Sequence, residues 1–462
     1  RSGTNSSISS ENPQTLAREG VFNREDMQLA YVALGSNLGD RVGALSRAWK
    51  LVQARLGPIV TTSSLYDTAP AVVEAQPRFV NAVVGVRCRA DVDPLGVLQV
   101  LKGIEADMGR EVRGRNGPRE IDLDLICLGD HVLRTEKLTL PHPRYAERAF
   151  VTVPLAEAAN RSPHRHALAD ALVASSTTAS NDDDACQRVL PCLRGARVLG
   201  DRTYVMAVLN LTPDSFSDGG NLKTLDDALF AADRAINDGA DLIDVGGEST
   251  RPGASPPTVE EEISRVAPVV DALKRHFSSD DDDADEARVV NISLDTRRAA
   301  VVRAVADRVD IINDVSGATF DEAMPDTLAK YPRLTYVATH SRGTPLDMQS
   351  RVQYDTERGV VGDVADELRS RTLEPLAAAG VAPWRVILDP GVGFAKTFDQ
   401  NLELLRDLDR LKRDEFADQF PVLVGPSRKG FIGNLLGGLP PEQCVVLVVR
   451  SFPIERCFIM PC

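Results

Sequence analysis

The sequence predicts an α/β protein of two units, a smaller α/β sandwich followed by a (β/α)8 barrel. The chain has 462 residues, which is enough for about two to three domains. Its first third alternates strand-like and helix-like patterns of apolar residues, whereas its last part repeats continuous apolar runs that each end in polar residues. A small, acidic stretch at 174–185 separates the two patterns and is typical of a linker.

The composition fits packed domains that bind small molecules. Hydrophobic residues make up 43% of the chain, which is ample for folded cores. The net charge of −14 argues against nonspecific nucleic-acid binding, so any phosphate site must be local. We expect no membrane partner, because no apolar run has membrane-spanning length. Seven scattered cysteines without a C-x-x-C pair indicate free thiols in a reducing compartment.

These patterns divide the chain into four segments. Residues 1–27 are a polar tail or the remnant of a transit peptide, although their acidic side chains are atypical of such peptides. We expect the first unit at 28–160, a linker at 161–200 and the barrel at 201–462. The acidic run at 278–287 interrupts the barrel pattern and is expected to be a surface insertion.

The first unit is expected to follow the order strand, helix, strand, helix, strand. The ranges are a strand and turn at 30–41, a helix at 43–56, a strand at 79–88, a helix at 93–109 and a strand at 117–129. The first helix carries one apolar stripe at helical spacing: Leu45, Trp49, Val52 and Leu56. Asp93 and Pro94 suit the start of the second helix. This order in this length predicts a ferredoxin-like α/β sandwich.

The last of these strands carries two aspartates two residues apart. Ile121, Leu123 and Leu125 alternate with Asp122 and Asp124, so one face is apolar and the other presents both carboxylates. Two neighbouring like charges raise one pKa unless a cation neutralises them. A pair of divalent metal ions would do so and would suit phosphoryl transfer. An edge strand with a wet face has the same pattern, so the surrounding residues must decide.

Basic residues surround the two aspartates. Four arginines precede them within ten residues: Arg110, Arg113, Arg115 and Arg119. Such a cluster is often only a solvated face, but beside two carboxylates it favours a site for a triphosphate. His142 follows in PHPRYAERAF and adds a further donor, although alone it would be read as structural.

The second unit repeats seven apolar runs separated by helical segments. They begin at YVMAVLN and continue through DLIDVGG, VVNISLD, VDIIND, LTYVATH, WRVILDP and PVLVGPSRKGF. Buried parallel strands have this continuous pattern, and the active site of a (β/α)8 barrel lies at the carboxyl ends of its strands. The polar residues at those ends are Asn210, Asp244, Asp295, Asn313, His340, Asp389 and Lys429. One such residue would be read as a cap, but seven on one rim predict a site.

The motifs of the first unit together resemble 6-hydroxymethyl-7,8-dihydropterin pyrophosphokinase. They are ALGSNLGDR, YDTAP, QPRFVNAVV, EADMGRE, GPREIDLDLICLG and PHPRYAERAF, between about Leu29 and Pro154. The resemblance implies that catalytic Asp122 and Asp124 hold two Mg²⁺ ions between ATP and the hydroxymethyl oxygen of the pterin. The implied ligands of ATP are Glu105, Arg110, Arg119 and His142, with Arg110 and Arg119 catalytic at the phosphates. Those of the pterin are Thr68, Phe79, Asn81 and Phe150, whose two aromatic rings would enclose it.

The motifs of the second unit resemble dihydropteroate synthase. NLTPDSFSDGG, DVGGESTRPGA, DPGVGF-x-K and SRKGF carry the resemblance, which spans about Thr203 to Gln443. It implies that a dihydropterin diphosphate is joined to 4-aminobenzoate with release of diphosphate. The implied pterin ligands are Asp295, Asn313, Asp389 and Lys429, of which Asp295 and Lys429 are also catalytic, and Asn210 would ligate one Mg²⁺. The implied loop residues are Asp214, Phe216 and Ser217, then Thr250 and Arg251, with Ser427 near the arylamine.

The carboxyl-terminal segment departs from this second family. The family has a further helix and an eighth strand ending in Arg-x-His, whereas this chain continues as PPEQCVVLVVRSFPIERCFIMPC. The sequence therefore predicts a barrel that is incomplete at its eighth strand. We assign no role to Arg450, although it could lie near the site.

Two functional hypotheses from different classes follow. The first is a bifunctional folate-synthesis enzyme, since the product of the first reaction is the substrate of the second. The alternative is a pyrophosphokinase fused to a pterin-binding barrel with little or no synthase activity. A pterin-binding methyltransferase barrel is disfavoured by SRKGF and by the first unit. We expect a mitochondrial enzyme, with the cytoplasm as the alternative, and a homo-oligomer through the barrel.

Overall fold

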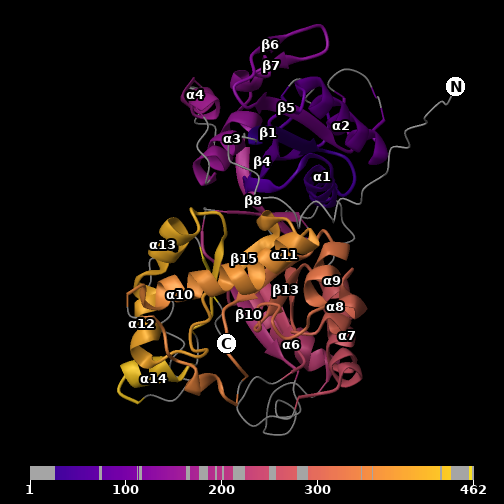
Figure 1. The fold of residues 1–462 in the computed structure, drawn as a ribbon. Coiled ribbons are helices and arrows are strands. Elements are labelled where there is room, and N and C mark those ends of the chain that lie inside the picture. Colours follow the sequence, from indigo (N-terminus) through magenta and orange to yellow (C-terminus); the bar gives the residue numbers. More distant parts are fainter. Residues whose placement is uncertain are drawn as a thin grey trace, which may run out of the picture.

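The computed structural model describes most of the 462-residue chain. The described residues are 27–71, 75–111, 113, 117–162, 167–175, 186–192, 195–199, 202–211, 224–248, 256–277, 290–344, 346–355, 357–426, 429–438 and 457–459. They form two units stacked end to end, with the first unit above the barrel in Figure 1. No helix in these ranges is both long and apolar enough to cross a membrane.

The first unit is built on one antiparallel sheet. Its strands are β1 (Met27–Ser36), β2 (Ile59–Thr62), β3 (Leu65–Thr68), β4 (Phe79–Arg89), β5 (Asp122–Leu128), β8 (Cys186–Cys192) and β9 (Gly195–Val198). Their order is β5-β1-β4-β3-β8-β9, with β2 also paired to β4. A separate small hairpin joins β6 (Leu133–Arg134) and β7 (Thr139–Leu140). The α/β sandwich predicted for this unit is confirmed.

Helices cover both faces of this sheet. They are α1 (Arg41–Leu56), α2 (Pro94–Asp107), α3 (Ala149–Arg161) and α4 (Ala167–Ser175). The predicted stripe of α1 faces one core through Leu45, Trp49 and Val52, which are buried, and through Leu56, which is partly buried. Asp93 does stand at the start of α2, but its side chain makes no capping hydrogen bond. The other face packs against α3 and α4 in a second core.

The segment 161–200 holds more structure than the linker expected there. It contains α4 and the hairpin of β8 and β9, and β8 pairs with β3 from Leu65↔Val189 to Thr68↔Cys186. The pairing covers the sheet edge that β3 would otherwise expose. Of the two buried apolar side chains of β8, Val189 packs in the core of the first unit and Leu190 packs in the cluster formed by the barrel strands. The segment therefore extends the first sheet before the chain enters the barrel.

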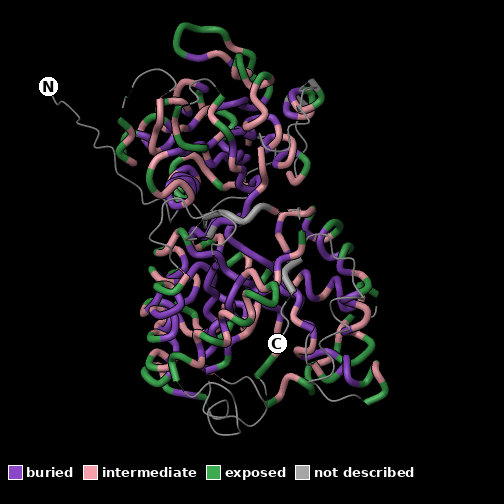
Figure 2. The backbone as a smooth tube through the Cα atoms, turned by 180° about the vertical axis from the view of Figure 1, so that it is seen from behind, coloured by how far each residue is buried: buried purple, intermediate pink, exposed green. Residues whose placement is uncertain are grey.

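The second unit is a closed barrel of parallel strands. They are β10 (Tyr204–Asn210), β11 (Leu242–Gly246), β12 (Asn291–Asp295), β13 (Ile311–Asp314), β14 (Thr335–Thr339), β15 (Val386–Asp389), β16 (Val422–Val424) and β17 (Cys457–Ile459). The helices outside it include α6 (Leu225–Asn237), α7 (Val259–His276), α8 (Ala299–Val305), α9 (Met324–Lys330), α10 (Gly359–Leu368), α11 (Glu374–Ala379), α12 (Phe398–Arg406), α13 (Leu408–Arg410) and α14 (Gly430–Leu435). Figure 2 shows buried backbone running through the centre of both units.

The predicted barrel is confirmed, but its expected gap at the eighth strand is corrected. Residues 457–459 form β17, which pairs with β16 on one side and with β10 on the other. The divergent terminal sequence supplies this strand because an apolar Cys-Phe-Ile run can occupy a ladder of backbone hydrogen bonds without the motif of the family. Closure therefore does not depend on the missing Arg-x-His.

Candidate active sites

One pocket of the first unit collects the residues predicted to bind the pterin ring. Thr68, Phe79, Asn81 and Phe150 line a cavity of about 540 Å³ that opens to solvent. They come from β3, β4 and the start of α3. The two aromatic side chains therefore border the same cavity from different elements, as two faces of a planar ligand would require.

A buried hydrogen bond fixes the polar wall of this pocket. Asn81 Nδ2 donates to Thr68 Oγ1 over 2.7 Å, and both side chains are buried. Gly35 of β1 makes room for them, since a Cβ there would lie 2.6 Å from Asn81 Oδ1. Arg119 and Arg148 also line the cavity. The pocket thus combines an amide and a hydroxyl with two cations at its edge.

The two aspartates of β5 lie on one face of the strand, as predicted. Leu123 and Leu125 are buried, whereas Asp122 and Asp124 are partly exposed between them. Asp122 accepts from Arg110 Nη1 over 2.6 Å and from Arg119 Nη1 over 2.7 Å. The structure therefore brings two of the four predicted arginines into contact with Asp122, while Arg113 pairs with Glu111 and Glu120 and Arg115 lies outside the described residues.

The donors around β5 fit divalent metal ions. Glu105 is turned toward the protein, where it accepts from the Leu123 N–H over 2.7 Å and lies 2.6 Å from Arg110. Burial raises the pKa of Asp124, and repulsion from Asp122 raises it further. A cation between the two carboxylates would relieve that repulsion. Among the described residues, no group of three or more His, Cys, Asp or Glu side chains is placed to hold a metal ion.

His142 lies beside these carboxylates. Burial lowers the pKa of its imidazole, and the charge of Asp124 acts in the opposite direction. Its Nδ1 accepts from the Arg144 N–H over 3.3 Å. Burial also lowers the pKa of Arg148, which faces Phe150 with its guanidinium 5.6 Å from the ring centroid. His142 is thus a neutral imidazole at neutral pH, able to contact a phosphate or base without adding charge.

In the barrel, the predicted polar residues stand in register at the carboxyl ends of adjacent strands. Asn210 pairs with Gly246, Gly246 with Asp295, and Asp295 with Asn313. Asp389 ends β15 and pairs with Thr339 of β14. Asn210 is exposed, while Asn313 and Asp389 are buried. The strand register therefore places these side chains on one rim, where the barrel pattern predicted the site.

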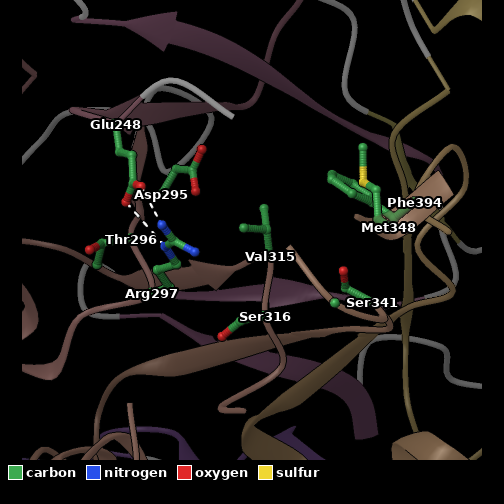
Figure 3. Close-up of a pocket in the computed structure, with 10 residues that line it drawn as sticks. Glu248, Asp295, Thr296, Arg297, Val315, Ser316, Ser341, Met348 and Phe394 are labelled. Atoms are coloured by element: carbon green, nitrogen blue, oxygen red, sulfur yellow. Dashed lines mark hydrogen bonds and ion pairs between the residues drawn. The ribbon is translucent and has the colours of Figure 1, made fainter. Parts of the chain in front are cut away.

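A cavity of about 580 Å³ opens beside this rim. Figure 3 shows Asp295 and the Arg297–Glu248 ion pair on one side, and Met348 and Phe394 on the other. The ion pair is held by two hydrogen bonds from the guanidinium to the carboxylate. This pocket has one acidic wall and one apolar wall, as a planar heterocycle with hydrogen-bonding edges would need.

Asp244 supports the acidic wall from inside the barrel. It is fully buried, and Asn313 Nδ2 donates to its Oδ2 over 2.9 Å. Burial raises the pKa of Asp244 to about 6, and burial together with the charge of Asp244 raises the pKa of Asp295 well above its usual range. A ligand that donates hydrogen bonds to these carboxylates would favour their ionised forms.

Lys429 reaches the same rim from the residue before α14. Its Nζ donates to the carbonyl of Val392 and lies 4.2 Å from the centroid of the Phe394 ring. Gly393 allows this approach, since a Cβ there would lie 2.4 Å from Lys429 Cδ. Burial raises the pKa of Asp389, whose Oδ1 accepts from the Gly391 N–H over 2.8 Å. The loop after β15 thus joins two of the predicted pterin ligands.

Sequence reasoning missed a buried relay behind this loop. Lys396 Nζ lies 3.0 Å from His340 Nδ1 and also donates to the carbonyls of Gly391 and Phe394 over 3.0 Å. His340 Nε2 lies 3.2 Å from Glu367. Burial lowers the pKa of Lys396 to about 7 and that of His340 to about 3. The sequence offered two separate signals, His340 at a strand end and the lysine of the DPGVGF-x-K motif, but no local pattern joins them to each other or to Glu367.

Several predicted residues fall outside the described ranges. These are Asp214, Phe216, Ser217, Thr250, Arg251 and Ser427, together with Arg450 of the terminal segment and the insertion at 278–287. Their roles stay predictions.

Two family models match the two units in turn. One, described as 7,8-dihydro-6-hydroxymethylpterin-pyrophosphokinase, matches residues 31–160. The other, described as pterin binding enzyme, matches residues 206–449. Both matches lie within the units that the structure separates.

Similar proteins combine both units in one chain. A mitochondrial folate synthesis bifunctional protein of Arabidopsis thaliana is 39% identical over 428 residues, which cover 88% of this chain and 74% of the relative. A second Arabidopsis thaliana protein, named folate synthesis bifunctional protein, is 36% identical over 433 residues, covering 88% and 86%. A mitochondrial relative from Pisum sativum is 39% identical over 428 residues, covering 87% and 80%.

Solved structures share the fold of the whole chain. An HPPK-DHPS structure in complex with substrates has a TM-score of 0.68 at 20% identity and covers 94% of this chain and 97% of its own. Wild-type Plasmodium falciparum HPPK-DHPS with pteroate has a TM-score of 0.66 at 22% identity, covering 94% of both chains.

Proposed function

The chain belongs to the family of bifunctional folate synthesis proteins, and from this premise we propose which residues of its two units carry out the two reactions. The first unit transfers diphosphate from ATP to 6-hydroxymethyl-7,8-dihydropterin. The second condenses the resulting dihydropterin diphosphate with 4-aminobenzoate and releases diphosphate. Enzymes of this family use ATP and Mg²⁺.

The assignment in the first unit is supported chiefly by the pocket formed by Thr68, Phe79, Asn81 and Phe150. Phe79 and Phe150 would stack on the two faces of the pterin, while Asn81 and Thr68 would hydrogen-bond its edge. The buried bond between Asn81 and Thr68 holds this edge in place before the ligand arrives.

Phosphate binding in the first unit requires an exchange of partners. Arg110 and Arg119 both pair with Asp122 in the structure. We infer that they turn from Asp122 to the phosphates of ATP. Asp122 and Asp124 would hold two Mg²⁺ ions, which would neutralise charge on the transferred group. Glu105 would stay behind as the anchor of Arg110, and His142 would contact the nucleotide as a neutral group. The pterin hydroxyl oxygen then attacks the β-phosphorus, AMP leaves, and the hydroxyl proton is lost.

In the barrel, Asp295, Asn313, Asp389 and Lys429 would hold the dihydropterin ring. Its ring N–H and amino groups would donate to the carboxylates, which favours their ionised forms despite burial. The methylene C–O bond breaks with both electrons going to diphosphate, and the electron-rich ring stabilises the cation that remains. The nitrogen of 4-aminobenzoate forms the new C–N bond and loses a proton. Asn210, at the exposed end of β10, would hold one Mg²⁺ for the leaving diphosphate.

The loop residues complete the proposal for the barrel. Asp214, Phe216 and Ser217 would close over the arylamine, Thr250 and Arg251 would contact the diphosphate, and Ser427 would border the arylamine subsite.

Single substitutions should separate the two activities in the full chain. Asp122→Ala should abolish release of AMP from ATP and pterin, while dihydropteroate still forms from supplied dihydropterin diphosphate. Asp295→Asn should weaken pterin binding to the barrel by about 1–3 kcal/mol and leave AMP release unchanged. Near-normal AMP release by Asp122→Ala would contradict the proposal that Asp122 holds Mg²⁺.

A second candidate function rests on the terminal segment. Because Arg-x-His is absent, the barrel could bind pterin with little turnover. A charged hydrogen bond to the diphosphate is worth about 1.5–3 kcal/mol. Replacing residues after Gln443 with a family-like ending that includes Gly-Thr and Arg-x-His should then raise synthase turnover. Equal turnover by both chains would eliminate this candidate.

Two wider properties complete the proposal. We propose a mitochondrial location, in keeping with the mitochondrial relatives, which subcellular imaging of the tagged full-length protein would test. We also propose a homo-oligomer through the barrel, where Phe230 of α6 is 72% exposed. Light scattering at several concentrations would measure its mass.

A further inference from the structure

The junction between the two units contains a barrel residue that belongs to the core of the other unit. Trp384 lies in a short 3-10 helix (Pro383–Arg385) immediately before β15. It is only 5% exposed, and its ring packs in the cluster formed by α1, α2 and the first sheet rather than in the barrel cluster. Ala382 belongs to the same cluster and is fully buried. The first unit therefore completes its core with side chains from the barrel.

The contact of Trp384 with α1 is also polar. Its Nε1 donates to Ser46 Oγ over 3.4 Å, and Ser46 Oγ lies 3.5 Å from the carbonyl of Pro332. One turn earlier on α1, Asp40 pairs with Arg333 of the barrel over 2.9 Å. Two successive barrel segments, before β14 and before β15, thus hold the start of α1.

A buried arginine fixes these two barrel segments to each other. Arg385 is 1% exposed, and its guanidinium donates to the carbonyls of Leu334, Leu328 and Tyr331 over 2.8 to 3.0 Å. These carbonyls belong to α9 and to the turn that carries Arg333. The platform that meets α1 is therefore rigid and is made by the barrel alone.

From the start of α1, contacts lead to the pterin pocket. Asp40 caps α1 by accepting from the Gly43 N–H over 2.8 Å. The next residue, Arg41, donates to Asp67 over 3.1 Å and to the Arg78 carbonyl over 2.8 Å. Asp67 and Arg78 directly precede the pocket residues Thr68 and Phe79 in the sequence.

A second path leaves the same turn on the other side. Asn37 Oδ1 accepts from the Arg119 N–H over 2.8 Å, and its Nδ2 donates to the carbonyl of Pro77 over 3.0 Å. Arg119 and Gln76, which also accepts from Asn37, line the pocket. A shift of the start of α1 would therefore move both sides of the pocket.

We propose that Trp384 and Arg333 of the barrel are positioning residues for the pterin pocket of the first unit. This inference rests on the pterin-binding role proposed for that pocket. It implies that loss of Trp384 affects the kinase site alone, because this side chain packs in the core of the first unit and not in that of the barrel, whereas the reverse contact is made by Leu190 of β8. The kinase site would need the barrel platform, whereas the synthase site would not need Trp384.

The test measures both reactions in the full chain carrying Trp384→Ala. The KM for hydroxymethyldihydropterin should rise between about fivefold and a hundredfold, the range expected when distant packing misplaces a binding group. The kcat for AMP release should fall less than the KM rises, because Arg119 is the one proposed phosphate ligand that this turn contacts through Asn37. Synthase turnover of supplied dihydropterin diphosphate should stay within about twofold of wild type. Trp384→Phe, which refills most of the apolar volume, should restore the KM.

Two substitutions of Arg333 keep the inference testable if Trp384→Ala does not fold. Arg333 is 48% exposed, so Arg333→Ala should fold normally and raise the pterin KM by about twofold to fivefold, as a half-exposed ion pair allows. Arg333→Lys keeps the charge and should behave as wild type. Arg406→Ala is the matched control, because it removes an exposed ion pair with Asp407 on α12 that does not touch the first unit.

The outcomes are distinguishable. An unchanged pterin KM in both Trp384→Ala and Arg333→Ala would overturn the inference, and so would an equal loss of both reactions. If the wild-type chain itself failed to use hydroxymethyldihydropterin, the proposed function of the first unit would fail instead.

Discussion

At the scale of single residues, the buried carboxylate of Asp244 makes the folding stability of the barrel depend on pH. Its pKa rises from 3.8 to about 6 because burial disfavours the charge. The folded barrel therefore binds a proton more tightly than the unfolded chain between these pH values. The stability from this group is fully present below about pH 4 and is lost as the pH rises through about 6.

Asp244→Asn should remove this pH dependence. The amide oxygen can still accept from Asn313, and no charge needs to be buried. Relative to wild type, the free energy of unfolding should increase with pH and level off above about pH 6.5 at a gain of order 2 kcal/mol. Urea unfolding between pH 4.5 and 7.5 without ligand would measure it. Parallel curves for the two proteins would contradict the assignment.

Lys396 gives a second prediction at this scale. Lys396→Met keeps the length of the side chain but leaves the buried carbonyls of Gly391 and Phe394 without a donor, each at a cost of about 1–3 kcal/mol. We expect the KM for dihydropterin diphosphate to rise about tenfold and AMP release by the first unit to stay unchanged. Glu367→Gln, which can still hydrogen-bond His340, should have the smaller effect. Equal kinetics in Lys396→Met and wild type would exclude a role for this relay.

Individual residues also show what the sequence could and could not predict. The alternation of Asp122 and Asp124 with leucines follows from the two-residue period of a strand, so it was visible without coordinates. The relay of Lys396, His340 and Glu367 joins three distant elements, and no local pattern encodes that meeting. Trp384 lies within an apolar run that fits a barrel strand, and only tertiary contacts show that its ring belongs to the other unit.

At the scale of elements, β17 decides whether the barrel is closed. The absence of the Arg-x-His motif led to the prediction of a missing eighth strand. That motif marks ligand-binding residues at the end of the strand, so its absence does not exclude the strand itself. Backbone pairing needs only three suitable residues, and residues 457–459 pair with both neighbours. The linker prediction failed for a related reason, since β8 was hidden between polar stretches and is defined by the edge of β3.

Removal of residues 457–462 should therefore open the barrel between β10 and β16. The two unpaired edges would invite association with other chains. We expect higher scattering at 37 °C and faster amide exchange in β10, while removal of 460–462 alone should change neither. A monodisperse truncated chain with wild-type synthase turnover would show that β17 is dispensable.

At the scale of the whole molecule, the first unit sits on the end of the barrel where its strands begin. Several barrel residues that meet it lie in segments that lead into strands: Arg333 before β14, Trp384 before β15 and Asp418 before β16. Thr335, the first residue of β14, also donates to the carbonyl of Pro191 in β8 over 2.5 Å. Asp418 contributes its carbonyl, which accepts from Arg161 over 2.5 Å and from Arg188 over 2.9 Å. The opposite end of the barrel carries the rim of Asn210, Asp295 and Asn313.

This stacking has a consequence for the traffic of the intermediate. With the two sites as proposed, dihydropterin diphosphate would be released from the first unit and consumed at the far rim of the barrel, so each molecule would cross bulk solvent and mix with the surrounding pool. When ¹⁴C-labelled hydroxymethyldihydropterin is converted in the presence of excess unlabelled dihydropterin diphosphate, the label in dihydropteroate should be diluted in proportion to the unlabelled dihydropterin diphosphate. An added enzyme that hydrolyses dihydropterin diphosphate should likewise destroy the intermediate before the barrel uses it, although the kinase unit and the synthase unit belong to one polypeptide. Fusion would then fix the numbers of the two active sites at a ratio of one to one, while the dihydropterin diphosphate that passes between them would stay exposed to solvent.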